Sequence, residues 1–147
     1  MIFEIIGTVA FSVSGAMVGI AKKMDIFGIV ILGLTTAVGG GVIRDVVLGI
    51  TPPITFVNPV YAAIAVVTAI VVFLPSVRRI ITKSPAYYEK VLLLMDSIGL
   101  GVFTAVGIRT AYGASYETAD ANNIFLLIFV GLVTGVGGGV LRDIMAG

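Results

Sequence analysis

Long apolar runs separated by short charged segments dominate this chain of 147 residues. About 20 apolar residues in a helix cross the hydrocarbon core of a bilayer, so each run predicts a membrane-spanning helix. The predicted spans are residues 5–21, 26–43, about 58–75, 91–108, and about 123–141.

The breaks between these spans follow from turn-forming residues. The charge-free stretch 46–77 is too long for one span, and three prolines within 52–59 predict a loop at about 49–57. Residues 110–123 are polar and predict a turn before the last span, which Asn122 or Asn123 would cap.

The basic residues predict the orientation of these spans. In the five-span layout, one side of the membrane receives Lys22, Lys23, Arg78, Arg79, Lys83 and Lys90. The other side receives the N-terminus, Arg44, Asp45, Arg109, Glu117 and Asp120. The positive-inside rule then places the N-terminus outside and residue 147 in the cytoplasm.

The chain contains an internal repeat. Residues 27–49 and 125–147 are identical at 12 of 23 positions without a gap, at an offset of 98. At an offset of 92, Glu4, Ile6, Gly7, Phe11, Ser12 and Gly15 align with Asp96, Ile98, Gly99, Phe103, Thr104 and Gly107.

Three predicted spans separate the start of one copy from the start of the next, so the second copy enters the membrane from the opposite face. We therefore predict an inverted repeat, with a first unit at residues 1–90 and a second at 91–147. Such repeats are typical of transport proteins, whose site lies between the two copies. The alternative is a duplication with no role in transport.

Each repeat carries a glycine triplet inside its second span, at Gly39, Gly40 and Gly41 and at Gly137, Gly138 and Gly139. Each glycine weakens a helix by about 1 kcal/mol relative to alanine. Small residues spaced four apart allow close helix packing, which accounts for some of these glycines. Three in succession predict a kink or an unwound turn, whose freed carbonyls suit a small cation.

Small hydroxyl side chains lie on the same predicted helices. The candidates for lining a polar pathway are Thr36, Thr134, Ser12, Ser14 and Thr104. For Ser12, Ser14 and Thr104, the alternative is that each hydroxyl bonds back to its own helix backbone.

Charged residues inside or beside the spans offer a second set of candidates. The pairs Arg44-Asp45 and Arg142-Asp143 would act as ion-pair latches, or would simply snorkel at helix ends. Glu4 and Asp96 are equivalent by repeat and would attract cations at the two mouths, or would stabilise helix N-termini.

The remaining basic residues each have two possible roles. Arg109 is either a flanking anchor or a charge that responds to voltage. Lys22, Lys23, Arg78 and Arg79 set the topology, with a lipid-phosphate site as the weaker alternative.

Composition places the chain in the membrane. It is 59% hydrophobic and 12% charged, with a mean hydropathy of +1.16, whereas an average soluble domain is about 25% charged. Cysteine and histidine are absent, and no nucleophile–base pair or phosphate-binding glycine loop is evident. We therefore expect no enzyme, no cofactor, no structural metal and no nucleic-acid partner.

The motifs GGGVIRD at 39–45 and GGGVLRD at 137–143, one in each half, resemble the trimeric intracellular cation channel (TRIC) family in its prokaryotic branch. The resemblance implies a homotrimer in a prokaryotic plasma membrane, with a potassium-type pore inside each subunit. It also implies bends at the two glycine triplets, a lining that includes Thr35, Thr36 and Thr134, and transient binding of potassium or sodium.

Some bacterial proteins with this signature resemble carriers of glycine or another small amino acid, so a carrier is the alternative function. A non-conducting scaffold assembled through the glycine stripes is a third. Members of the family usually have seven spans, and five are predicted here. We therefore expect the sequence to be truncated after the second span of its second repeat.

Overall fold

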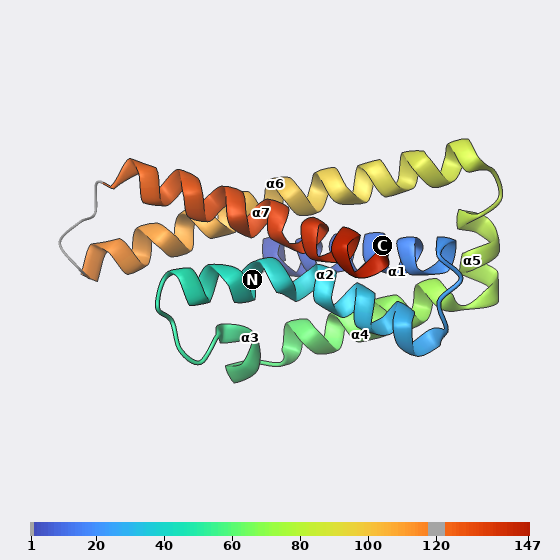
Figure 1. Cartoon of the computed structure of the whole chain (residues 1–147), viewed down its shortest axis with the longest axis horizontal. Helices are drawn as coiled ribbons and strands as arrows, with labels where there is room; N and C mark the ends of the chain where they lie inside the picture. The colour runs from blue at the N-terminus through green and yellow to red at the C-terminus, as the bar shows by residue number, and fades with distance from the viewer. Residues whose placement is uncertain (1, 118–122) are drawn as a thin grey trace.

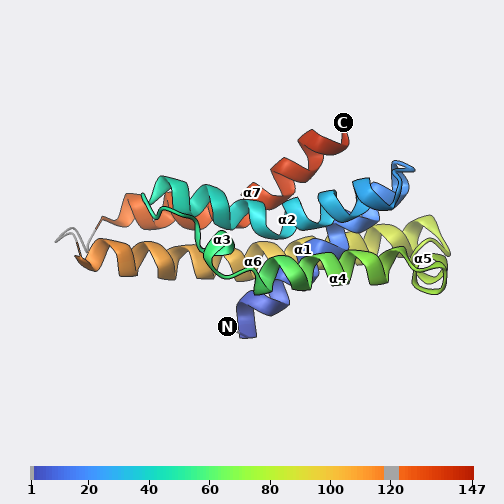
Figure 2. The ribbon, with the colours of Figure 1, turned by 90° about the horizontal axis from the view of Figure 1, so that it is seen from below.

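The computed structural model describes residues 2–117 and 123–147, and every regular element in that part of the chain is a helix. Figure 1 shows most of the long helices running along one axis, and Figure 2 shows that the first helix crosses the others obliquely. The elements are α1 (Ile2–Ala21), α2 (Ile26–Val47), α3 (Ile54–Val57), α4 (Val60–Phe73), α5 (Pro75–Ile81), α6 (Pro85–Glu117) and α7 (Ile124–Ala146).

Four of these helices, α1, α2, α6 and α7, are long and apolar enough to cross a membrane. The pair α4 and α5 makes a fifth candidate, bent by 76° at Leu74. The predicted all-helical membrane fold is confirmed, although the third span ends at Phe73 and the chain then turns into α5 (Figure 1).

Side-chain caps fix the start of both glycine-rich helices. Asp25 accepts a hydrogen bond from the Gly28 backbone N–H at 2.8 Å and so caps α2. Asn123 caps α7 in the same way, accepting from the Leu126 N–H at 3.0 Å. The predicted cap at Asn123 is confirmed, whereas Asn122 lies outside the described residues.

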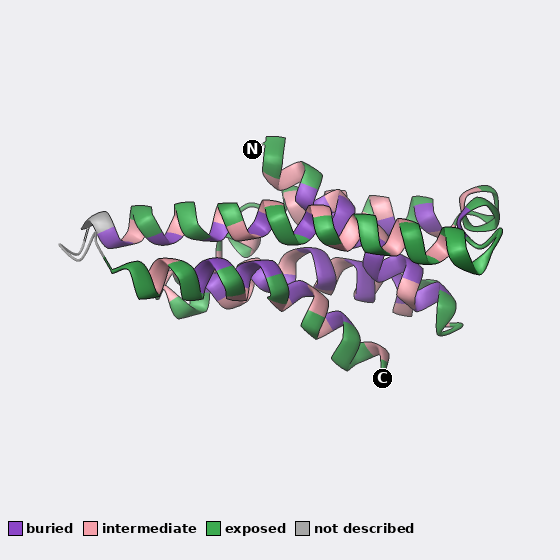
Figure 3. Ribbon diagram, turned by 90° about the horizontal axis from the view of Figure 1, so that it is seen from above, coloured by how far each residue is buried: buried purple, intermediate pink, exposed green. Residues whose placement is uncertain are grey.

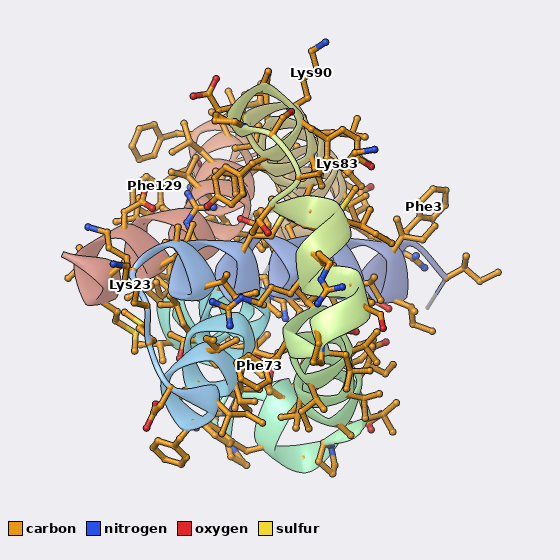
Figure 4. The ribbon with its side chains drawn as sticks, turned by 90° about the vertical axis from the view of Figure 1, so that its right-hand side faces the viewer. Phe3, Lys23, Phe73, Lys83, Lys90 and Phe129 are labelled. Carbon is orange, nitrogen blue, oxygen red and sulfur yellow. The ribbon has the colours of Figure 1, made fainter. Side chains whose placement is uncertain are left out.

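The core lies where α1, α2 and α4 meet, with Met17, Ile29 and Ala69 fully or almost fully buried. Figure 3 shows buried residues along the inner faces of the long helices and exposed residues along their outer faces. The outer faces are apolar, which suits contact with lipid. In Figure 4 the side chains of Phe3 and Phe129 point away from the bundle, whereas Phe73 packs against the core.

The predicted turn at residues 110–123 is wrong in its first part, because α6 continues as helix to Glu117. Ala111 and Ser115, one turn apart, are 0% and 2% exposed. Burial against neighbouring helices thus keeps this polar stretch helical, and tertiary contacts override its local composition. The predicted boundary between the two repeat units, at residues 90 and 91, falls inside helix α6. The division into two units stays a prediction.

Neither glycine triplet interrupts its helix, because α2 and α7 are each assigned as one continuous helix. The unwound turn that we considered from sequence is therefore wrong. Figures 2 and 3 show instead that α7 changes direction along its length, so that its C-terminal part diverges from the bundle. A bend at each glycine triplet stays a prediction, with which the change of direction in α7 agrees.

Candidate functional site

The first helices of the two repeats, α1 and α6, make reciprocal contacts. Phe11 stacks on Phe103, its repeat equivalent, with ring centroids 5.3 Å apart. A Cβ on Gly7 would lie 3.1 Å from the Phe103 ring, and a Cβ on Gly99 would overlap the Phe11 ring. When the two repeats are exchanged, each of these contacts maps onto the other, as a two-fold axis requires.

The second helices, α2 and α7, cross with the same reciprocity. A Cβ on Gly40 would overlap the Thr134 carbonyl oxygen, and a Cβ on Gly138 would overlap the Thr36 carbonyl oxygen. Only glycine permits this approach of backbone to backbone. The middle glycine of each triplet therefore defines the crossing point of the two repeats.

The hydroxyls of Thr36 and Thr134 do not face an open path in this structure. They donate to the carbonyls of Leu32 and Val130 in their own helices, both at 2.6 Å, and both threonines are 0% exposed. Both hydroxyls therefore bond back to the backbone of their own helix. A pore-lining role for them stays a prediction.

On one side of the crossing lies the Arg142 cluster, which consists of Arg142, Asp96, Asp143 and Ser14. The Arg142 Nη1 atom contacts both carboxylate oxygens of Asp96 at 2.6 and 2.8 Å, and Nε bonds Asp143 at 2.8 Å. Ser14 donates to Asp96 at 2.6 Å and accepts from Arg142. This cluster joins α1, α6 and α7.

On the other side lies the Arg44 cluster, which consists of Arg44, Asp45, Glu4 and Tyr61. Asp45 is fully buried and accepts from Arg44 at 2.8 Å and from the Ile54 N–H at 2.8 Å. Glu4 accepts from the Tyr61 hydroxyl at 2.8 Å. Within residues 2–117 and 123–147, the ion pairs of Arg44 go to Asp45 rather than to Glu4.

Two adjoining cavities open beside the Arg44 cluster. The smaller, about 80 Å³, is lined by Glu4, Arg44, Tyr61 and Gly41 among others. The larger, about 800 Å³, is mostly apolar and includes Arg109. Both are lined by Glu4 and Val106, and the smaller one reaches Arg44; we call the two cavities together the vestibule.

The remaining predicted residues lie apart from this vestibule. Ser12 donates to the Ala65 carbonyl at 2.6 Å and so ties α1 to α4. The Thr104 side chain packs where a Cβ on Gly135 would lie, and Thr35 is partly buried.

Of the basic residues expected on the cytoplasmic face, Arg78 and Arg79 belong to α5 and Lys23 lies beside it. Lys23 and Arg78 line a cavity of about 380 Å³, and Arg79 lines a neighbouring one of about 290 Å³. Figure 4 looks onto this end of the molecule, where Lys90 projects away from the helices. Lys22 is exposed beside Lys23.

Sequence reasoning missed Tyr61, although it is the partner of Glu4. Its signal was weak, because a tyrosine at the start of a predicted span is also typical of an interfacial anchor.

Comparison with known proteins identifies relatives over nearly the whole chain. A family model described as "Glycine transporter" matches residues 1–76 and 93–147. A UPF0126 membrane protein of Deinococcus radiodurans is 38% identical over 97% of this chain and 61% of its own length. The inner membrane protein YadS of Escherichia coli is 34% identical over 97% of this chain and 64% of its own length. The chain thus spans less than two thirds of these relatives.

Solved structures agree with this assignment. A TRIC cation channel aligns with a TM-score of 0.82 and 41% identity, covering 99% of this chain and 66% of the channel. The TRIC orthologue from Rhodobacter sphaeroides aligns with a TM-score of 0.84 and 34% identity, covering 99% of this chain and 69% of that one.

Proposed function

Because this chain belongs to the prokaryotic TRIC family, which the glycine-transporter family model also describes, we propose that it is a monovalent cation channel. Its pathway would run within one subunit, past the crossing of α2 and α7, and the subunits would form a homotrimer. The N-terminus would lie outside the cell. Potassium is the proposed main ion.

The observation that carries this proposal is the position of the two arginine clusters. Ionisable residues inside a membrane are costly and usually mark an ion or substrate path. Here Arg44 and Arg142, 8% and 7% exposed, lie in equivalent positions of two inverted repeats. A vestibule lined by Glu4 leads to one of them.

A carrier for glycine is the second candidate, and the small cavity favours it specifically. Glu4 and Arg44 present opposite charges to the same space of about 80 Å³. A zwitterion of that size would place its ammonium group near Glu4 and its carboxylate near Arg44. The description of the matching family model as a glycine transporter points the same way.

Purified protein in planar bilayers and in liposomes separates these functions. Discrete current steps in potassium chloride, absent with an impermeant cation, would support the channel. Saturable uptake of labelled glycine without current steps would support the carrier and contradict the channel. Neither activity would favour the scaffold that we considered from sequence.

The crossing of the helices supplies the variant and its control. Gly40→Leu places a side chain into the Thr134 backbone and should abolish either activity. Gly101→Leu adds the same side chain where, apart from the adjoining helix backbone, none of residues 2–117 and 123–147 has an atom within 4 Å of the new Cβ, so transport should persist. Undiminished transport in Gly40→Leu would remove the crossing from the mechanism.

A further inference from the structure

The two arginine clusters occupy equivalent positions of the repeats, but the residue that bonds both charges in the Arg142 cluster has no polar counterpart in the Arg44 cluster. The offset that aligns Glu4 with Asp96 also aligns Ser14 with Val106. Ser14 is fully buried and bonds both Asp96 and Arg142, whereas Val106 has no polar side-chain atom with which to do the same. Val106 lines both cavities of the vestibule instead.

The clusters also differ in whether their carboxylate and arginine meet. Asp96 and Arg142 are in contact at 2.6 Å. Their repeat equivalents, Glu4 and Arg44, line a cavity together, while Tyr61 holds Glu4 and Asp45 holds Arg44. The Asp96–Arg142 pair is therefore in contact, whereas the equivalent Glu4–Arg44 pair in the same structure is not. We call the first pair closed.

We propose that Ser14 is a positioning residue that keeps the Arg142–Asp96 pair closed, so that the path past the helix crossing opens first at the Arg44 end. This inference rests on the proposed transport function, because it assigns the two pairs as the two gates of one path. The Ser14 hydroxyl donates to the carboxylate and accepts from the guanidinium, so it stabilises the closed pair from a third helix. Val106 gives the Arg44 end no such bond.

Two glycines provide matched reporters for the two gates. A Cβ on Gly41 would have Arg44 Nη2 as its nearest neighbour at 3.9 Å, and a Cβ on Gly139 would have Arg142 Nη2 at 4.0 Å. A cysteine therefore fits at either position, and the chain contains no other cysteine. The rate at which a small water-soluble maleimide labels each single cysteine measures access to each gate.

We expect Gly41→Cys to react faster than Gly139→Cys when Ser14 is present. Adding Ser14→Ala should raise the labelling rate of Gly139→Cys by about tenfold, the scale of one lost hydrogen bond to a charged group. It should leave the rate of Gly41→Cys unchanged. Ser14→Thr keeps a hydroxyl and should restore slow labelling. Ser97→Ala removes an exposed hydroxyl that bonds the Leu93 carbonyl of its own helix, so it serves as the matched control that changes neither rate.

An unchanged labelling rate of Gly139→Cys when Ser14→Ala is added would overturn the inference. Asp96→Asn weakens the same bonds and must change the rate in the same direction, which keeps the test decisive if Ser14→Ala does not fold. Potassium flux is measured on the same proteins. Absence of flux in every variant, alongside the expected labelling, would overturn the proposed function but leave the role of Ser14 in place.

Discussion

At the scale of single residues, the side chain that most needs compensation for its burial is the Asp45 carboxylate, which is fully removed from solvent. Two Arg44 nitrogens, at 2.7 and 2.8 Å, and the Ile54 N–H compensate for this desolvation. Removing one partner from a buried pair leaves a charge without compensation, which costs more than the pair itself contributes.

We therefore predict that Arg44→Ala destabilises the protein by about 3–5 kcal/mol. Asp143→Asn is the control, because the Asp143 side chain is 66% exposed and Arg142 keeps its bonds to Asp96 without it. Its cost should be about 1 kcal/mol or less, as for other exposed pairs. Thermal unfolding in one detergent checks both variants, and equal costs would contradict the role of burial.

At the scale of helices, the crossing of the two repeats is organised by close approach at small residues. Gly15 and Gly107 are an example: a Cβ on either would lie 2.6 Å from the hydroxyl oxygen of Thr36 or Thr134, respectively. In lipid there is no water to drive helices together, so association depends on packing of this kind.

We predict that Gly40→Ala and Gly138→Ala lower stability by similar amounts, about 1–3 kcal/mol each. The costs in stability should match because each new methyl group would overlap the backbone carbonyl oxygen of the equivalent threonine, Thr134 or Thr36, in the opposite repeat. Gly101→Ala has open space around it and should be neutral or stabilising, since alanine favours helix by about 1 kcal/mol. Chemical or thermal unfolding measures all three, and markedly unequal costs would contradict the two-fold relation.

Much of this organisation was predictable from the apolar runs and from the repeat, because both leave regular patterns in the sequence. The helical course of residues 110–117 was not, since it depends on burial of Ala111 and Ser115 by other elements. The partners of Glu4 and Asp96 were equally hidden, because Tyr61 and Ser14 come from other helices. The difference between Ser14 and Val106 is visible in the aligned repeats but gains meaning only from the contacts.

At the scale of the whole molecule, the orientation in the membrane is the first consequence to test. The positive-inside rule predicts that Lys83 faces the cytoplasm and that Thr51 faces outside. Both residues are exposed, and the chain has no native cysteine. In intact cells, an impermeant maleimide should label Thr51→Cys and spare Lys83→Cys, and labelling should be equal after lysis. The reverse pattern would invert the proposed topology.

The last prediction concerns where the pore lies in the assembly. If each subunit of the proposed trimer holds its own path, a subunit with Gly40→Leu loses only its own conductance, because the blocked crossing joins two helices of one chain. Trimers with zero, one, two or three variant subunits should then show three, two, one or no open current levels, with populations that follow the binomial mixing ratio. A single pore on the trimer axis predicts a different result, in which blocked subunits change or abolish one shared current level. Single-channel recordings at several ratios of the two subunits distinguish these cases, and loss of all current in trimers with one variant subunit would contradict a pore within each subunit.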